Sequence, residues 1–337
     1  MAGTLHGFGL GVASKNAKGD VLDVFYPTPL ANISGDLVSI FDGVSGELKA
    51  TEIRALSDGL RSAGEHALAD IAVRLGEADQ PVVASLLADN AAPQTVADAY
   101  LKLHLLSHRL IKPHGTDLTG MFALLPNVAW TDEGPIDLAE LADRQLTSRL
   151  KGRVLEVASV DKFPKMTNYV VPSGVRIAHT ARVRLGAYLG SGTTVMHEGF
   201  INFNAGTDGP GMIEGRISAG VMVGKGSDLG GGCSTMGTLS GGGNIIISVG
   251  ESCLLGANAG LGIPLGDRCT VEAGLFVTAG TKVTVLDDAR EAVETLAARH
   301  LSGQSDLLFR RNSQSGSVEC LTNQTAIELN ESLHDNN

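Results

Sequence analysis

The stretch IAHTARVRLGAYLGSGTTVMHEGFINFNA, residues 177–205, places an aliphatic residue at every sixth position. These aliphatic residues are Ile177, Val183, Leu189, Val195 and Ile201. A small residue follows each of them four places later, namely Ala181, Ala187, Thr193, Gly199 and Ala205. Six-residue repeats of this kind are typical of a parallel β-helix, in which each hexad forms one flat side and three sides close one coil.

A second run of hexads lies further along the chain. The period returns at Val249, Leu255 and Leu261, slips by four residues, and continues through Leu265, Val271, Val277 and Val283. We interpret the slip as a bulge or a short insertion, and the stretch between the two runs as irregular. In such a coil the aliphatic residue points inward and stacks on its equivalent one coil away, while the small residue permits the tight corner.

The composition agrees with a narrow prism. Aromatic residues make up 4% of the chain and glycines number 43, because such a prism has little room for rings and needs many sharp corners. A glycine-rich β-sandwich is the alternative. A calcium-binding roll of the RTX type is excluded, because its Asp-bearing nonapeptides are missing.

Charge and hydropathy limit the partners of this chain. The formal net charge is -11, and no cluster of Lys and Arg offers the positive stripe that nucleic-acid binding requires. No apolar window approaches the roughly 18 residues of a membrane span, and the first residues do not resemble a secretory leader. The four cysteines show no metal-binding spacing, and we expect them to be buried rather than paired. The chain is therefore predicted to be cytoplasmic, with no nucleic-acid or membrane partner.

Residues 1–170 are predicted to form an N-terminal α/β domain. Apolar residues recur at spacings of three and four over 51–75 and 95–111, which predicts amphipathic helices. Thr95 and Asp98 resemble a capping box at the start of the second helix. A third helix is expected over 137–155, and strands are expected over 20–26 and 37–41.

The β-helix is assigned to residues 171–285, entered through a hinge at 172–174, and a small C-terminal α/β cap to 286–337. Within the cap, a helix is expected over 287–301 from its composition. The segments LLFRRN and SVECLT are expected to form two strands joined by a turn at 313–316, and TAIELNESLH a final helix. Caps are needed because the last coil of a solenoid otherwise exposes apolar core and unpaired strand edge.

Two glycine triplets, 230–232 and 241–243, bracket the sequence CSTMGTLS where the hexad count fails. We expect a loop to project there, since consecutive glycines let backbone N–H groups converge on an anion or an oxyanion. Just before it, Glu214 and Arg216 point to the same side of a predicted strand. Arg216 is placed to receive an anionic group. The spacing alone favours a solvated surface carboxylate for Glu214.

Other polar side chains are weaker candidates. His104 and His108 are four apart on a predicted helix, but no third metal ligand is evident, so surface histidines are the favoured interpretation. Glu198 lies seventeen residues after Ala181, which places the two on neighbouring coils near one corner. In a trimer, three copies of Glu198 at the axis would require a cation or protonation. A lone surface carboxylate is the alternative.

Long motifs resemble a known family, the tetrahydrodipicolinate N-succinyltransferases of actinobacteria and pseudomonads. Within the predicted coils the resemblance lies in MHEGFINFNAGT (196–207), MIEGRISAGVMVGKGSDLGGGCSTMGTLSGGG (212–243) and CLLGANAGLGIPLGD (253–267). Outside them it lies in VFYPTPL, YLKLHLLSHRLIKPH, LLPNVAW, VDKFPKM and LLFRRNSQSG, so it covers most of the chain. The resemblance implies a left-handed parallel β-helix, a homotrimer and no covalent cofactor.

The implied reaction passes the succinyl group of the co-substrate succinyl-CoA to the amine of ring-opened tetrahydrodipicolinate, in the diaminopimelate and lysine pathway. The glutamate of MIEGR, Glu214 here, is the implied catalytic carboxylate and would form an acyl-anhydride. The implied contacts to succinyl-CoA and substrate are Arg216, Gly231, Ser234, Ala257, Glu272, Ala273, Gly280, Arg310, Arg311, Asn312 and Ser313. Glu198 is the implied magnesium ligand at the trimer axis.

The chain departs from the family pattern at two places. A family lysine that contacts CoA aligns with Ala297, although Arg299 is close by. The companion aspartate of the magnesium glutamate is replaced by Ala181.

Two other functions remain open. One is a hexapeptide acyltransferase with an acetyl donor, for which His197 is the nearest candidate for the catalytic histidine. The other is a non-catalytic β-solenoid scaffold, which would leave the glycine triplets and the pair Glu214 and Arg216 unexplained.

Overall fold

The computed structural model describes residues 4–237 and 245–322. Its contacts divide the chain into two compact units. The first comprises residues up to 111 together with 115–164 and 168–170, and the second comprises 112–114, 165–167 and the chain from 171 onward. The three-domain division, 1–170, 171–285 and 286–337, stays a prediction. None of the helices within the described residues is long and apolar enough to cross a membrane.

The first unit is built around strand β1 (Leu5–Lys15), which pairs antiparallel with three other strands. β2 (Val21–Phe25) and β3 (Leu30–Ile33) lie along one of its edges, and β5 (Val82–Leu87) lies along the other. The short β4 (Gly46–Glu47) continues the sheet beyond β5. The expected strand over 20–26 is confirmed by β2.

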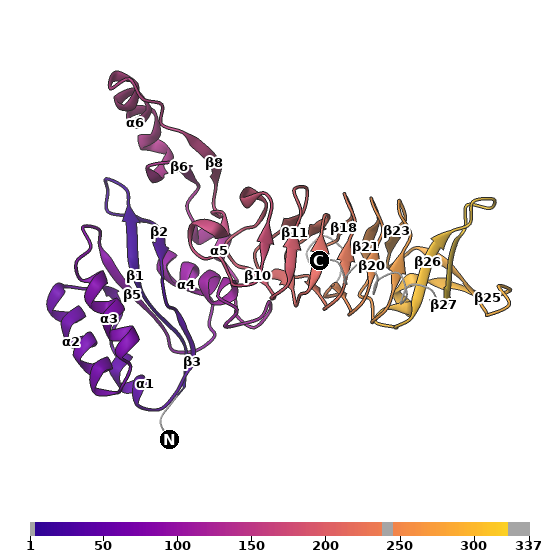
Figure 1. The fold of residues 1–337 in the computed structure, drawn as a ribbon, viewed down its shortest axis with the longest axis horizontal. Helices are drawn as coiled ribbons and strands as arrows, with labels where there is room; N and C mark the ends of the chain where they lie inside the picture. Colours follow the sequence, from indigo (N-terminus) through magenta and orange to yellow (C-terminus); the bar gives the residue numbers. More distant parts are fainter. Residues whose placement is uncertain (1–3, 238–244, 323–337) are drawn as a thin grey trace. The chain divides into compact units, whose positions relative to one another are not determined.

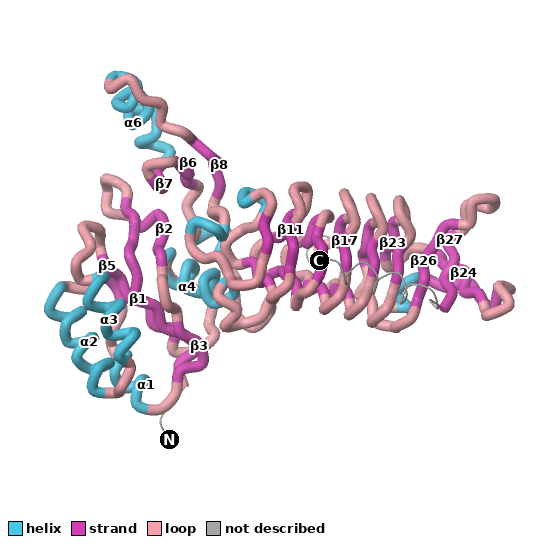
Figure 2. The backbone as a smooth tube through the Cα atoms, viewed as in Figure 1, coloured by secondary structure: helices cyan, strands magenta, loops and turns pink. Residues whose placement is uncertain are grey.

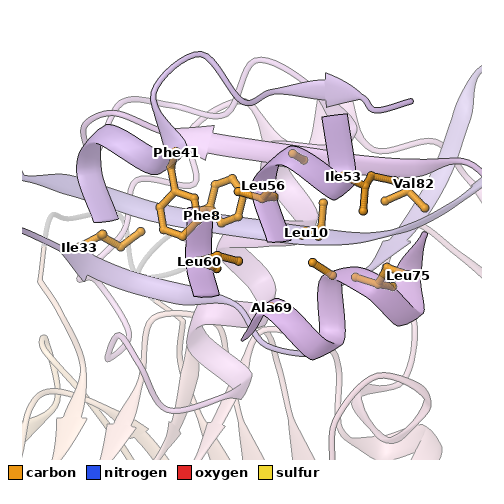
Figure 3. Close-up of a cluster of buried hydrophobic side chains, with 12 residues drawn as sticks. Phe8, Leu10, Ile33, Phe41, Ile53, Leu56, Leu60, Ala69, Leu75 and Val82 are labelled. Carbon is orange, nitrogen blue, oxygen red and sulfur yellow. The ribbon is translucent and has the colours of Figure 1, made fainter. Parts of the chain in front are cut away.

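The two faces of β1 differ because its sequence, HGFGLG, alternates between apolar residues and glycine. Phe8 and Leu10 belong to a buried cluster with α1 (Asp36–Phe41), α2 (Ala50–Ser62) and α3 (His66–Leu75), shown in Figure 3. On the opposite face a Cβ on Gly9 would lie 2.6 Å from the Tyr26 ring and 2.8 Å from Leu101 of α4 (Val96–Ser107). The missing side chain therefore lets α4 pack closely.

The helices differ in part from those expected. The segment 37–41 was predicted as a strand, which is wrong, because Asp36–Phe41 forms α1 and buries Phe41 in the cluster. The helix expected over 51–75 is interrupted at Gly64, whose φ of 82° does not fit an α-helix, and becomes α2 and α3. The capping box is confirmed, since Thr95 Oγ1 accepts from the Asp98 N–H at the start of α4.

A smaller antiparallel sheet completes the first unit. It contains β6 (Val128–Thr131), β7 (Gly134–Asp137) and β8 (Val157–Asp161), in the order β7-β6-β8. The short helix α5 (Met121–Leu124) precedes it. The helix expected over 137–155 is α6 (Leu138–Leu150), which ends earlier because Lys151 and Gly152 leave the helix and Gly152 has a φ of 71°.

The second unit is a coil whose short strands form three parallel sheets (Figures 1 and 2). The first face contains β9 (Arg176–Ile177), β11 (Thr193–Val195), β14 (Gly211–Ile213), β17 (Asp228–Leu229), β20 (Leu254–Leu255) and β22 (Thr270–Val271). The second face contains β12 (Phe200–Ile201), β15 (Arg216–Ile217), β18 (Ser234–Thr235), β21 (Gly260–Gly262) and β23 (Phe276–Thr278). The third face contains β10 (Ala187–Leu189), β13 (Ala205–Thr207), β16 (Met222–Val223) and β19 (Ser248–Val249). The chain visits the faces in turn, so the predicted parallel β-helix is confirmed as a coil.

The register fixes the length of each coil. Ala187 pairs with Ala205, so that coil has 205 − 187 = 18 residues, whereas Phe200 pairs with Arg216, so that coil has 216 − 200 = 16. The predicted aliphatic residues face inward and are 0–3% exposed from Val183 to Val283 where they lie in this coil. All four cysteines are free and buried, as expected.

The two irregularities in the hexad pattern have a common form. The step from Ile213 to Ile217 is four residues, and so is the step from Leu261 to Leu265, while all four of these side chains are buried. The slip is therefore a side shortened by two residues, and the bulge or insertion that we expected is wrong. The period continues through Thr235 and resumes at Val249, so the excursion from the coil begins after the first glycine triplet. The second triplet, 241–243, lies outside the described residues.

The C-terminal part extends the first face. β24 (Lys282–Leu286) and β25 (Ala292–Ala297) form an antiparallel hairpin, followed by a 3-10 turn, η3 (Ala298–Leu301). The helix expected over 287–301 is wrong, because residues 292–297 pair with the edge of β24 and form a strand instead. β26 (Leu307–Arg311) and β27 (Val318–Thr322) form the expected second hairpin, and β26 pairs parallel with β22. The segment TAIELNESLH lies outside the described residues.

Replacing Leu255, which is 0% exposed in the inward column of the first face, tests the stacking. We expect Leu255→Ala to destabilise the coil by about 2–5 kcal/mol, because a cavity opens between neighbouring coils. Denaturant unfolding followed by circular dichroism measures this change. The control Val293→Ala, at a position 64% exposed in β25, should stay within about 0.5 kcal/mol of the starting protein. Equal shifts for both variants would contradict the stacking account.

Candidate functional site

The turns between the first and second faces stack on one another and form a column that we call the first corner. This corner consists of residues 178–182, 196–199, 214–215, 230–233, 256–259 and 272–275, one segment from each successive coil. Neighbouring segments are about 4.8 Å apart, the spacing of paired strands. Residues far apart in the sequence are thereby brought into one line.

Glu214 occupies the shortest segment of the first corner. Only Glu214 and Gly215 separate β14 from β15, and both of their N–H groups donate to the Leu229 carbonyl of the next coil, at 2.8 and 3.1 Å. A Cβ on Gly215 would lie 2.2 Å from Cys233 Sγ, so the tight turn requires glycine. The Glu214 carboxylate extends toward the next coil, where its Oε2 lies 3.4 Å from the Cβ position of Gly231. The structure therefore brings together Glu214 and the first glycine triplet, as predicted.

Arg216 and Ser234 lie side by side on the outer surface of the second face. They are partners in the ladder between β15 and β18. Arg216 donates from Nε and Nη2 to the single Ser234 Oγ, at 3.0 and 2.8 Å. The bonds hold the plane of the guanidinium while two of its five N–H groups are used, so donors remain for an anionic ligand.

An open cavity of about 520 Å³ lies in front of these groups. Its lining residues are Arg182, Glu198, Phe200, Glu214, Gly215, Arg216, Gly232 and Cys233. Two carboxylates and two guanidiniums therefore face one space. Such a site can hold an anionic ligand against the guanidiniums while a carboxylate moves a proton or attacks an electrophile.

Sequence reasoning missed Arg182 and Phe200 as lining residues. The signal for Arg182 was the coil length, because 198 − 182 = 16 and 214 − 198 = 16 place Arg182, Glu198 and Glu214 at one corner. Phe200 could have been found from its ladder partner, since it pairs with Arg216 across β12 and β15.

Cys233 forms part of the cavity wall with a side chain that is 1% exposed. Burial raises the pKa of its thiol to about 12, and the negative charge of Glu214 adds to the rise. The thiol is therefore protonated at neutral pH and is a poor nucleophile.

The remaining predicted contacts lie further along the coil. Ala257, Glu272 and Ala273 are exposed on the first corner, two and three coils from Glu214. The Arg311 N–H donates to Glu272 Oε2 at 2.6 Å, which joins the corner to β26. From the Glu214 coil to β26 there are four coil steps, or roughly 19 Å.

The loop after β26 is held by a buried carboxylate. Glu319, 7% exposed, accepts from Asn312 Nδ2 at 2.7 Å and pairs with Arg310 at 2.9 Å. The hydrogen bond from Asn312, together with Arg310, lowers the pKa of Glu319. Ser313 follows in the exposed turn that ends at Gly316.

Gly280 is not at the first corner. It lies in the turn that follows β23, between the second and third faces, and it is exposed. Within one chain the structure therefore does not bring Gly280 together with Ala257 and Glu272.

The predicted magnesium ligand fits a metal poorly. Glu198 Oε2 pairs with Arg182 Nη2 at 3.1 Å and Oε1 lies 3.2 Å from His197 Nδ1, so a cation of the protein already neutralises this carboxylate. The Ala181 side chain offers no oxygen ligand. Within the described residues of one chain there is no group of three or more His, Cys, Asp or Glu side chains able to hold a metal ion.

The helix histidines are not surface residues as expected. His104 is 0% exposed, donates from Nδ1 to the Tyr100 carbonyl at 2.8 Å and accepts the Tyr26 N–H at Nε2, at 3.2 Å. Burial lowers the pKa of His104 to about 3. Both nitrogens are thus used in packing α4 against the strand end, which leaves His104 without a lone pair for a metal.

Comparisons with known proteins agree with this geometry. Residues 125–165 match the family described as tetrahydrodipicolinate N-succinyltransferase middle, and residues 246–279 match the hexapeptide repeat of succinyl-transferase. The chain is similar to a crystal structure described as a 2,3,4,5-tetrahydropyridine-2-carboxylate N-succinyltransferase of Campylobacter jejuni. That similarity has a TM-score of 0.86 and 33% identity, and covers 96% of this chain and 93% of the other.

The sequence relatives are closer. The 2,3,4,5-tetrahydropyridine-2,6-dicarboxylate N-succinyltransferases of Pseudomonas aeruginosa and Pseudomonas putida are each 63% identical, with 100% of both chains covered. The enzyme of the same name from Vibrio cholerae is 58% identical, with 98% of both chains covered. On this identity over its whole length, the chain belongs to the 2,3,4,5-tetrahydropyridine-2,6-dicarboxylate N-succinyltransferase family.

Proposed function

We propose that this chain transfers the succinyl group of succinyl-CoA to the amine of ring-opened tetrahydropyridine-2,6-dicarboxylate. The products are N-succinyl-2-amino-6-oxopimelate and CoA, within the diaminopimelate and lysine pathway. The observation that carries the proposal is the position of Glu214, half-buried at the shortened corner and facing a cavity that also contains Arg216. The names of the relatives support the choice of substrates.

Glu214 supplies the chemistry in either of two ways. As a general base it takes a proton from the attacking amine, the nitrogen bonds to the thioester carbonyl carbon, and the C–S bond breaks to release the CoA thiolate. As a nucleophile it first displaces the thiolate and forms a succinyl anhydride, which the amine then opens to regenerate the carboxylate. Both routes need the amine, the thioester and Glu214 held in line.

Arg216 orients the acyl group. Its guanidinium, fixed by Ser234, is two residues from Glu214 and pairs with the free carboxylate of the succinyl group. An acetyl group has no such carboxylate, so this pairing favours the succinyl donor. Gly231 and Gly232 beside Glu214 leave room for the thioester.

The CoA part extends along the first corner toward β26. Ala257, Glu272 and Ala273 leave an open path, and the roughly 19 Å of four coil steps suits the long, thin pantetheine arm. Arg310 to Ser313 lie at the far end of this path. Arg310 and Arg311 supply positive charge for the CoA phosphates.

The coil is proposed to be left-handed and the enzyme to be a cytoplasmic homotrimer. The hexapeptide repeat and the three faces of 16 or 18 residues per coil support the handedness. Gly280, on a different corner from Ala257, supports a groove completed by a neighbouring subunit. Magnesium at the trimer axis stays a prediction, and because Glu198 is paired with Arg182, no step of the mechanism uses it.

Of the two alternatives, a histidine-dependent acetyl transfer lacks support, because His197 is not among the described residues that line the cavity. One assay separates all three functions, namely the release of CoA thiol from succinyl-CoA or acetyl-CoA, with and without tetrahydropyridine-2,6-dicarboxylate. Release that requires both succinyl-CoA and the dicarboxylate supports the proposal. Equal release from acetyl-CoA would favour the first alternative, and no release from either donor would favour the scaffold.

Glu214→Gln should lower turnover by at least about 10²-fold, because the amide keeps the size of the side chain but has neither basicity nor nucleophilicity. Succinyl-CoA affinity and subunit assembly should stay near those of the starting enzyme. Trapping with succinyl-CoA alone then divides the two routes, since only the nucleophile acquires a succinyl adduct on the Glu214 peptide. Turnover of Glu214→Gln close to normal would contradict both roles.

The homotrimer predicts a mass in light scattering of about three times the chain mass of 34.9 kDa. Activity should fall on dilution below the concentration at which the subunits separate, because the groove is shared. A stable monomer with full activity would contradict the shared groove.

Thiol reagents should not inactivate the enzyme at pH 7 to 8. With a pKa of about 12, only about one Cys233 side chain in 10⁴ is a thiolate at pH 8. The measurement is residual activity after treatment with iodoacetamide, with peptide mapping of Cys233, and the same treatment after denaturation as the control. Rapid alkylation of Cys233 in the native enzyme would show that the thiol is not held protonated by burial.

A further inference from the structure

A second cation in the cavity, Arg182, has no role in the proposed reaction as described so far. It ends the 3-10 turn η2 (Thr180–Arg182) at the first corner and lines the cavity together with Glu214 and Arg216. Two coil steps separate its segment of the corner from that of Glu214, which is roughly 10 Å. It therefore lies at the opposite end of the cavity from the glycine triplet.

The Arg182 guanidinium is held in place by its neighbours. Its Nη2 lies 3.1 Å from Glu198 Oε2, and Glu198 Oε1 lies 3.2 Å from His197 Nδ1. A guanidinium has five N–H donors, so the bond to Glu198 leaves an edge for a second carboxylate. The side chain of Arg182 is 40% exposed, so a ligand in the cavity can reach it.

The charges of the substrates require a further cation. Arg216 is assigned to the carboxylate of the succinyl group, but the acceptor is a dicarboxylate and adds two more negative charges. The cavity already contains the carboxylates of Glu198 and Glu214. Of the residues that line it, Arg182 is the other cation that can offset the acceptor.

We propose that Arg182 binds the acceptor carboxylate that is remote from the reacting amine, and so determines specificity for a diacid acceptor. The inference rests on the proposed function and deepens it. In the ring-opened acceptor the amine carbon and the remote carboxyl carbon are five bonds apart, roughly 6 Å. With a hydrogen bond of about 3 Å, this length spans most of the separation between the Glu214 and Arg182 segments. Glu198 acts as a positioning residue for the guanidinium.

The test compares a diacid with a monoacid of the same chain length. 2-Aminoheptanedioate and 2-aminoheptanoate differ only in the remote carboxylate, and each is used as a competitor of tetrahydropyridine-2,6-dicarboxylate. The starting enzyme should bind the diacid at least about 10-fold more tightly, the lower end for a charge-assisted hydrogen bond. Arg182→Gln should bind both competitors with similar affinity. Its kcat/KM for the acceptor should fall by about 10- to 150-fold, mainly through KM, while KM for succinyl-CoA stays within about twofold.

Matched variants separate this role from a structural one. Arg182→Lys retains the charge and should restore part of the preference for the diacid. Arg216→Gln should reduce the preference for succinyl-CoA over acetyl-CoA and leave the ratio of the two competitors unchanged. Arg176→Gln, at an exposed arginine of β9 outside the residues that line the cavity, should change neither.

Each outcome decides a different point. An unchanged diacid to monoacid ratio in a folded Arg182→Gln enzyme would overturn the inference, while CoA release by the starting enzyme would leave the proposed function intact. Absence of CoA release from the starting enzyme with the dicarboxylate would overturn the proposed function and this inference with it. A loss of diacid preference in Arg176→Gln as well would also overturn it, because the effect would then be one of general surface charge.

Discussion

The stacking of inward aliphatic side chains on one another is the interaction on which the second unit depends. Val195, Ile213, Leu229, Leu255 and Val271 form such a column behind the first face, each 0–1% exposed. Each residue is buried only when the next coil covers it, so the coils stabilise one another in sequence. The backbone ladder fixes the same register, because every parallel pair brings together residues 16 or 18 apart. Side-chain burial and hydrogen bonding therefore select one alignment.

This alignment also creates the site. Once the aliphatic residues are stacked, the corners must stack as well, and Arg182, Glu198, Glu214 and Gly231 fall into one column. The chain shortens one corner at Glu214 by two residues, and Gly215 makes the closer turn possible because Cys233 leaves no room for a Cβ. The catalytic carboxylate is thus placed by a backbone that the next coil holds at Leu229. Such a backbone is rigid enough to keep reacting groups in line.

Charges in the cavity are arranged in pairs that limit the cost of placing them close together. Arg182 is next to Glu198, and Arg216 is held by Ser234 on the other side of Glu214. These groups remain in contact with solvent, so each ion pair contributes little to stability. Their value lies in orientation, because each guanidinium is fixed before a carboxylate ligand arrives. The same neutralisation of Glu198 by Arg182 is the reason that its fit to a metal ion is poor.

The sequence by itself determined the coil, because a period of six residues with an inward aliphatic side chain has one economical packing solution. It also determined the capping box at Thr95, the hairpin of β26 and β27, and the pairing of Glu214 with the glycine triplet, since all of these depend on residues close in the sequence or on whole coil lengths. Tertiary structure alone decided the segments whose local preference was outweighed. Residues 37–41 became helix α1 to bury Phe41, and residues 292–297 became a strand because the edge of β24 was open to pairing.

The composition of the cavity was also a tertiary decision. Arg182 has no motif of its own, and it reaches the site only because two shortened coils of 16 residues place it on the corner of Glu198 and Glu214. Gly280 was separated from Ala257 for the same reason, since the face on which a residue lies depends on the summed lengths of all the preceding sides. His104 was buried because Gly9 and Gly11 let α4 and Tyr26 approach β1, a contact between segments about 90 residues apart that helix periodicity does not encode. Local pattern thus fixed the repeating unit, and the exact length of each turn fixed which side chains meet.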